Sequence, residues 1–196
     1  MLVSSQRLNG SGARYEISFQ MQVHGRFCYA KEYILFMNKA YLLMGGNVGD
    51  TLGSLQQAID ILATDYGTIL QESRIYRTAP WGKINQQVFL NQAVLLETAL
   101  TADALLTGLL HTEETMGRKR VEKYGPRIID IDILLYNNSV IKSRGLTVPH
   151  PQLQYRRFAL APLNEIASSV VHPVLNKTIQ QLLQDCPDDL PVSVFE

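Results

Sequence analysis

The sequence predicts an α+β fold, a ferredoxin-like βαββαβ core in which an antiparallel sheet carries two helices on one face. Three observations support this prediction. Four segments have strand character, two segments carry apolar residues at helical spacing, and the six alternate in the required order between residues 39 and 136. The chain has 196 residues, which suits one domain or one domain with an extension. Its 46% hydrophobic and 18% charged residues exclude disorder as the main state.

The first half of the core begins with a short apolar strand at 40–44. A helix follows, for which Asp50 or Thr51 is a suitable cap. Its predicted apolar face consists of Leu52, Leu55, Ile59 and Leu62. The helix ends at Gly67, and a second strand is predicted over 68–77.

The second half repeats the pattern with longer elements. A third strand is predicted at 88–98, followed by a helix that Thr101 caps. A basic loop leads into a fourth, strongly apolar strand at 128–136. We expect loops and shorter elements over 137–196, with a last amphipathic helix near 177–184.

Residues 1–36 are predicted to form an N-terminal extension ahead of a domain at 37–196. The composition of 1–13, rich in Ser, Gly, Asn and Arg, predicts disorder. Apolar residues then alternate strictly over 15–23, which predicts a strand that pairs with 26–36 as a hairpin. An alternative is that translation naturally starts at the methionine that opens the domain, so that the extension lies upstream of the true start.

Overall charge and hydropathy exclude several classes of function. Eighteen Lys and Arg residues balance eighteen Asp and Glu residues, so the chain lacks the basic signature of a nucleic-acid binder. No apolar run approaches the length of a membrane span, and the N-terminus lacks the apolar core of a signal peptide. Cys28 and Cys186 lie too far apart in sequence for a CxxC site. We therefore expect a cytoplasmic monomer or weak homodimer without nucleic-acid or membrane partners.

The fourth predicted strand carries the most informative pattern. Residues 128–135 read Ile-Ile-Asp-Ile-Asp-Ile-Leu-Leu, so Asp130 and Asp132 share one face, about 6.6 Å apart along the strand. Two carboxylates on an apolar strand repel each other and lose hydration unless a partner compensates. Mg²⁺ provides such compensation, typically with one or two carboxylates and substrate phosphates as ligands. Contact with solvent or with arginines alone is the alternative.

Five basic side chains precede this strand within ten residues: Arg118, Lys119, Arg120, Lys123 and Arg127. Next to a carboxylate pair, this basic loop favours a polyphosphate held between metal ions and guanidinium groups. Gly117 and Gly125-Pro126 flank the loop and suggest that it moves as a lid. A solvated run of charge is the alternative.

Three further loops carry polar and aromatic residues. The glycine-rich turn at 45–49 could present backbone amides to an anion, although the motif taken alone is better explained as a tight turn. The only tryptophan, Trp81, lies in a loop, and Phe89 and Asn91 share one face of the third strand. Such a mixture suits a flat heteroaromatic ligand, with core packing as the alternative. His150 lies in a polar loop and, taken alone, is most simply structural.

Together these segments resemble the 6-hydroxymethyl-7,8-dihydropterin pyrophosphokinase family, over about Lys39 to Cys186. The most specific match is the run from Gly125-Pro126-Arg127 through Asp130 and Asp132 to Leu134. Four further matches follow the family's order: Gly45 to Asn47, Tyr76-Arg77-Thr78, Phe89-Leu90-Asn91, and Leu146 to His150. Tyr124, Phe89 and Trp81 depart from the residues common in the family, which puts details of the substrate pocket in doubt.

The resemblance implies transfer of pyrophosphate from ATP to the hydroxymethyl group of a reduced pterin, with release of AMP. It implies Arg118, Arg127 and Asp132 as catalytic residues, and Asp130 and Asp132 as ligands of two Mg²⁺ ions. The implied ATP site comprises Glu113, Arg118, Arg120, Arg127, Ile133, Thr147, His150 and Arg156. The implied pterin site comprises Gly45, Asn47, Thr78, Ala79, Trp81, Phe89, Asn91, Tyr124, Asp130 and Phe158. Loops 79–88 and 118–127 would close over both substrates.

Three alternatives to this function remain open. A noncatalytic ferredoxin-like module could bind a nucleotide or RNA, but two acids on a central strand repel a phosphate backbone. A phosphotransferase that releases ADP could use the same local chemistry. A degenerate, inactive relative is disfavoured, because both aspartates and the key arginines are present.

Overall fold

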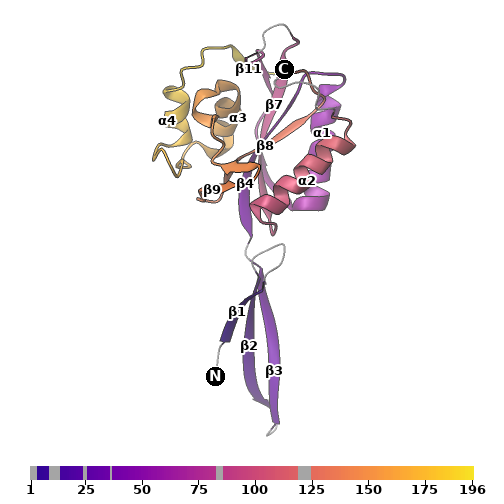
Figure 1. Cartoon of the computed structure of the whole chain (residues 1–196), viewed down its shortest axis with the longest axis vertical. Coiled ribbons are helices and arrows are strands. Elements are labelled where there is room, and N and C mark those ends of the chain that lie inside the picture. Colours follow the sequence, from indigo (N-terminus) through magenta and orange to yellow (C-terminus); the bar gives the residue numbers. More distant parts are fainter. Residues whose placement is uncertain (1–3, 9–13, 24–25, 36, 83–85, 119–124) are drawn as a thin grey trace.

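The computed structural model describes residues 4–8, 14–23, 26–35, 37–82, 86–118 and 125–196. Its centre is a six-stranded antiparallel sheet (Figure 1). The strands are β4 (Asn38–Gly46), β5 (Thr68–Glu72), β6 (Tyr76–Thr78), β7 (Phe89–Thr98), β8 (Asp130–Tyr136) and β11 (Val192–Val194). Their order is β11-β6-β7-β4-β8, and β5 also pairs with β7. With β4 between β7 and β8, the predicted ferredoxin-like arrangement is confirmed.

Two helices cover one face of the sheet, as predicted: α1 (Thr51–Ile61), which continues as a short π-helix at Leu62–Tyr66, and α2 (Ala102–Thr115). Asp50 and Thr101 cap them, because each side chain accepts a hydrogen bond from a backbone N–H of the first turn. Leu55, Ile59 and Leu62 are buried. The prediction for Leu52 was wrong, since it is exposed and Ala58 takes the buried place on α1.

A second pair of helices, outside the predicted βαββαβ core, covers the opposite face of the sheet (Figure 1). These are α3 (Arg157–Ala167) and α4 (Ile179–Gln184), of which only α4 was predicted. Pro162 lies inside α3 and breaks the helical pattern in the sequence. Leu160 and Leu163 of α3 pack against Tyr41 and Leu43 of β4 in this second core.

The second predicted strand is divided in two, because its ladder with β7 is interrupted at Ser73. There the Ser73 hydroxyl accepts a hydrogen bond from the Ala93 N–H (2.9 Å), a place that a backbone carbonyl would otherwise take. The C-terminal part also adds a small hairpin, β9 (Ile141–Ser143) and β10 (Leu146–Val148), and a 3₁₀ turn at Leu153–Tyr155. The hairpin and the 3₁₀ turn precede α3. Strand β10 of the hairpin contacts β8, which we call the carboxylate strand because it carries Asp130 and Asp132.

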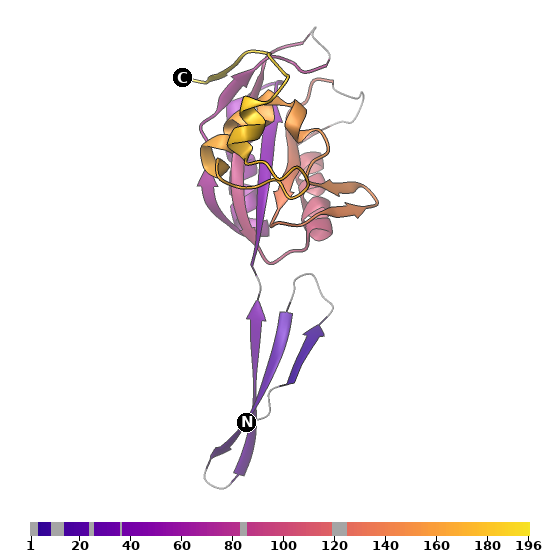
Figure 2. The same cartoon turned by 90° about the vertical axis from the view of Figure 1, so that its left-hand side faces the viewer.

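The N-terminal residues form a separate three-stranded sheet of β1 (Ser4–Leu8), β2 (Arg14–Val23) and β3 (Arg26–Leu35), visible in Figure 2. The predicted hairpin corresponds to β2 and β3. Disorder at residues 4–8 was a wrong prediction, because their backbone pairs with β2. The division into an extension and a domain stays a prediction. None of the described helices has the length and hydropathy needed to cross a membrane.

Candidate active site

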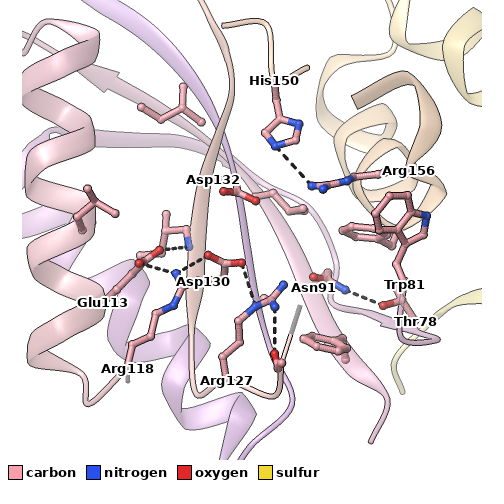
Figure 3. A pocket seen from close by; sticks show the side chains of 18 of the residues that line it. Thr78, Trp81, Asn91, Glu113, Arg118, Arg127, Asp130, Asp132, His150 and Arg156 are labelled. Atoms are coloured by element: carbon pink, nitrogen blue, oxygen red, sulfur yellow. Dashed lines mark hydrogen bonds and ion pairs between the residues drawn. The ribbon is translucent and has the colours of Figure 1, made fainter. Parts of the chain in front are cut away.

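A cavity of about 690 Å³ opens beside β4, β7 and β8 (Figure 3). Its size is typical of small-ligand sites. Sixteen of the predicted site residues line it: Gly45, Thr78, Ala79, Trp81, Phe89, Asn91, Glu113, Arg118, Arg127, Asp130, Asp132, Ile133, Thr147, His150, Arg156 and Phe158. Arg120 and Tyr124 lie outside the described residues. The fold therefore gathers segments that are up to 113 residues apart in sequence around one space.

The two aspartates enter this cavity from β8, whose alternate isoleucines are buried in the core. Asp130 forms ion pairs with Arg118 (Nη1 to Oδ1, 2.5 Å) and with Arg127 (Nε to Oδ2, 2.9 Å). The pKa of Asp132 is raised to about 7, mainly by burial and also by the nearby charge of Asp130, against the opposing effect of Arg156. The site thus disfavours a second negative charge in the absence of a cation.

The donor set of this site fits magnesium bound together with a polyphosphate. Asp130 and Asp132 supply carboxylate oxygens, which Mg²⁺ prefers. Among the residues that the structure describes, no three His, Cys, Asp or Glu side chains gather at one point. The remaining ligands would therefore have to be water and phosphate oxygens, as is usual for this ion.

Glu113 connects the end of α2 to the carboxylate strand. Its Oε2 lies 2.5 Å from Arg118 Nη1, and its Oε1 accepts a hydrogen bond from the Ile131 N–H (2.8 Å). Burial raises the pKa of Glu113, although this hydrogen bond lowers it in part. The Arg118 guanidinium is consequently held between Glu113 and Asp130, facing the cavity (Figure 3).

Asn47 does not line the cavity, although the sequence placed it in the pterin site. Its side-chain oxygen accepts a hydrogen bond from the Arg127 N–H (2.9 Å), and its Nδ2 donates to the Gln87 carbonyl (3.1 Å). The Asn47 N–H also donates to the Arg127 carbonyl (2.9 Å). In this structure Asn47 fixes the backbone that carries Arg127.

A group of three side chains forms one side of the cavity, and we call it the aromatic wall: Trp81, Arg156 and Phe158. The Arg156 guanidinium lies 4.9 Å from the centre of the Trp81 ring and 5.7 Å from that of Phe158. The two rings are tilted, with centroids 6.4 Å apart. Cation–π contacts of this kind are stabilising when partly desolvated. The wall presents aromatic surface to a flat ligand.

Asn91 of β7 and Thr78 of β6 lie near Trp81 in the same cavity (Figure 3). Asn91 Nδ2 donates a hydrogen bond to Thr78 Oγ1 (2.7 Å), and both residues are buried. Gly45 lies beside them, and a Cβ atom at this position would come within 2.1 Å of Asn91 Oδ1. Only glycine therefore leaves the amide of Asn91 in its place.

His150 faces the cavity in its neutral form. Burial and, to a lesser extent, the charge of Arg156 together lower the pKa of its imidazole to about 4. Its Nδ1 accepts a hydrogen bond from the Gln152 N–H (3.2 Å), and its Nε2 lies 3.4 Å from Arg156 Nη1. At neutral pH the ring is thus an uncharged polar contact for a ligand, and it takes up a second proton only near pH 4 and below.

The sequence did not identify several apolar lining residues, among them Leu106 and Leu110 of α2 and Leu146 of β10. Their helical or strand spacing predicts core packing equally well. Only the tertiary fold places these three leucines at the cavity. Strand β10 belongs to the β9–β10 hairpin that contacts β8, and α2 also contacts β8.

Gly45→Ala should weaken binding of the flat ligand about tenfold, because the new methyl group displaces the Asn91 amide. The check is a titration of the reduced pterin that the family resemblance implies, followed by Trp81 fluorescence, in both single variants Gly45→Ala and Asn91→Ala and in the double variant. Because both substitutions affect one amide, their effects should not add. Additive losses would contradict the displacement of Asn91.

The fold and the cavity lining together define a class of protein. An antiparallel α+β domain brings two carboxylates and several arginines next to an aromatic wall, in one cavity. This arrangement is typical of an enzyme that transfers a phosphoryl or diphosphoryl group from a nucleotide to a flat heteroaromatic acceptor.

Comparison with known proteins places the chain within that class. Residues 41–168 match the model of the 7,8-dihydro-6-hydroxymethylpterin-pyrophosphokinase family. The chain is 40% identical over 148 residues to a 2-amino-4-hydroxy-6-hydroxymethyldihydropteridine pyrophosphokinase of Methylorubrum extorquens, covering 75% of this chain and 92% of that protein. A protein of the same name from Synechocystis is 42% identical over 153 residues, or 76% of this chain and 78% of that one. The chain belongs to the 7,8-dihydro-6-hydroxymethylpterin-pyrophosphokinase family.

The fold also matches solved structures. A crystal structure of Plasmodium falciparum HPPK-DHPS superposes with a TM-score of 0.64, at 19% identity and over 76% of this chain. This chain spans 45% of that longer chain. At such low identity the likeness concerns the fold alone, and it agrees with the ferredoxin-like arrangement of the sheet.

Proposed function

We propose that this chain transfers pyrophosphate from ATP to the hydroxymethyl group of 6-hydroxymethyl-7,8-dihydropterin, giving AMP and the pterin diphosphate for folate synthesis. Membership of the family supports this reaction. The observation that carries the proposal is the single cavity that joins the carboxylate and arginine cluster to the aromatic wall. An acceptor hydroxyl and a triphosphate would meet where these two parts adjoin.

Asp130 and Asp132 are the proposed ligands of two Mg²⁺ ions. When bound, magnesium neutralises phosphate charge and orients the attacking hydroxyl. Asp130 is paired with Arg118 and Arg127 in this structure. On binding of the metal–nucleotide complex, these arginines would turn from Asp130 to the phosphate oxygens, which offer them charge-assisted hydrogen bonds.

Arg118, Arg127 and Arg120 are the proposed triphosphate contacts. Arg118 and Arg127 would stabilise the charge that develops during transfer, which makes them catalytic with Asp132. The rest of the proposed ATP site comprises Glu113, Ile133, Thr147, His150 and Arg156. Because Glu113 contacts Arg118 and the Ile131 N–H, we assign it the role of orienting Arg118.

The proposed pterin site lies between the aromatic wall and Asn91. The Asn91 amide would read the polar edge of the ring, and Thr78 fixes that amide through its hydroxyl. Trp81, Phe158 and Phe89 would supply aromatic contact area. Gly45, Ala79, Asp130 and Tyr124 complete the proposed set, with Asn47 acting through the backbone of Arg127.

We propose that the enzyme is cytoplasmic and acts as a monomer or weak homodimer, without nucleic-acid or membrane partners. The zero formal net charge supports the lack of a nucleic-acid partner. The assignment of 1–36 as an extension of the domain 37–196 is part of the same proposal.

Analysis of the nucleotide product tests the proposed reaction. The full chain is incubated with ATP, Mg²⁺ and 6-hydroxymethyl-7,8-dihydropterin, and AMP is resolved from ADP. We expect pterin-dependent AMP that disappears when EDTA is added. Release of ADP would contradict pyrophosphate transfer, and the absence of any pterin-dependent product would favour the noncatalytic binding module.

A further inference from the structure

The aromatic wall is built from two elements that are distant in sequence. Trp81 follows β6, whereas Arg156 and Phe158 stand at the start of α3. The spacing between them decides whether a flat ring fits, because aromatic contacts weaken steeply with distance. The distance between Trp81 and the first turn of α3 therefore has to be fixed by contacts from another part of the chain.

The C-terminal segment 188–195 contacts α3 at one of its ends, through Asp188. The Arg157 N–H donates to Asp188 Oδ2 (3.0 Å), and Arg157 Nε donates to the Asp188 carbonyl (2.7 Å). The side chain of Arg156, the residue before the helix, makes no capping hydrogen bond. Asp188 thus acts as the cap of α3, and its negative charge favours the positive end of the helix.

The other end of segment 188–195 contacts β6 and the residue that follows it, Ala79. β11 pairs with β6 in antiparallel register, with Val192 opposite Thr78. The Ala79 N–H donates to the Pro191 carbonyl (3.3 Å), two residues before Trp81. Asp188 Oδ1 accepts from the Leu190 N–H (3.1 Å), which fixes the turn between the two ends.

We propose that Asp188 is a positioning residue for the pterin. Through its cap on α3 and its turn into β11, it holds Phe158 and Arg156 at the correct distance from Trp81. The wall is then formed before the substrate arrives, so binding does not have to order it. This proposal rests on the proposed function, since it takes the wall to be the pterin site.

The test compares Asp188→Ala with Asp189→Ala, a neighbouring exposed aspartate that serves as the matched control. Because Trp81 is the only tryptophan, its fluorescence reports on the wall directly. We expect Asp188→Ala to weaken pterin binding about tenfold. Acrylamide should quench Trp81 more strongly in this variant. The affinity for a nonhydrolysable ATP analogue should fall much less than the pterin affinity, because Arg156 is the only wall residue that also belongs to the proposed ATP site, and kcat at saturating pterin should stay within about twofold of wild type. The control should change none of these values.

Equal losses of pterin and nucleotide affinity in Asp188→Ala would overturn the proposal, because they indicate a general structural role. Unchanged pterin affinity would overturn it as well. If Asp188→Ala does not fold, Arg157→Gln takes its place. This substitution removes the hydrogen bond from Arg157 Nε to the Asp188 carbonyl and keeps the one from the Arg157 N–H to the Asp188 side chain. Arg157→Gln must also weaken pterin binding, or the proposal fails. If adding pterin does not change the Trp81 fluorescence of the wild-type protein although AMP is formed, the aromatic wall is not the pterin site. The proposed reaction would then still hold.

Discussion

Asp132→Asn should lower kcat about a thousandfold and leave the protein folded. The substitution removes one of the two β8 carboxylates that face the cavity and keeps the shape of the side chain. It therefore removes a proposed magnesium ligand with little effect on packing. The measurement is pterin-dependent AMP formation at saturating substrates, with circular dichroism to verify the fold. Asp65→Asn, on an exposed aspartate, is the control and should keep wild-type activity.

The same variant should be more stable than wild type in EDTA at pH 8. The pKa of Asp132 is raised from 3.8 to about 7 in the folded protein. Between these values the folded state binds more protons than the unfolded state, so the contribution of Asp132 to stability falls as pH rises and stays unfavourable above pH 7. Asparagine does not titrate. The difference in Tm, variant minus wild type, should accordingly grow from pH 4 to pH 7. A variant that is less stable than wild type at pH 8 would contradict this account of the site.

Arg127→Ala should lower kcat about a thousandfold, an effect typical of arginines that stabilise the charge of a transferring phosphate. Pterin affinity should fall much less. Some loss is expected because the Arg127 guanidinium lies 5.0 Å from the centre of the Phe89 ring. Arg127→Lys should recover only part of the rate, since an ammonium cannot form the paired hydrogen bonds of a guanidinium.

Single-turnover kinetics and pterin titration together measure these effects. Arg74→Ala is a suitable control, because Arg74 is an exposed residue whose ion pair with Glu165 lies on the surface. If Arg127→Ala weakens pterin binding and leaves the rate of the single turnover intact, its role in the transition state is wrong.

The sequence predicted the core of the fold because local patterns encode it. The alternation of residues 128–135 predicts one buried face and one acidic face, and β8 has both. Asp50 and Thr101 are recognisable caps because their side chains act on neighbouring backbone groups. In contrast, α3 contains Pro162, which argues locally against a helix, and its burial against β4 outweighs that preference.

Sixteen of the site residues that the family resemblance implies line the cavity, but the contacts between them were not predicted. Spacing alone does not show that Asp130 is paired with Arg118 and Arg127, because these contacts depend on where the two arginines lie relative to β8. The role of Asn47 toward the Arg127 backbone is equally invisible in sequence, since the two residues are 80 positions apart. The cap of α3 by Asp188 is a tertiary contact of the same kind.

Counting bound metal ions tests the central claim most directly, namely that Asp130 and Asp132 hold divalent cations together with the nucleotide. Mn²⁺ replaces Mg²⁺ as a paramagnetic probe, and free Mn²⁺ is measured by electron paramagnetic resonance with a nonhydrolysable ATP analogue present. The account predicts two bound Mn²⁺ ions per wild-type chain, and fewer in Asp130→Ala and Asp132→Ala at the same analogue occupancy. Two ions in either variant, bound as tightly as in wild type, would contradict it.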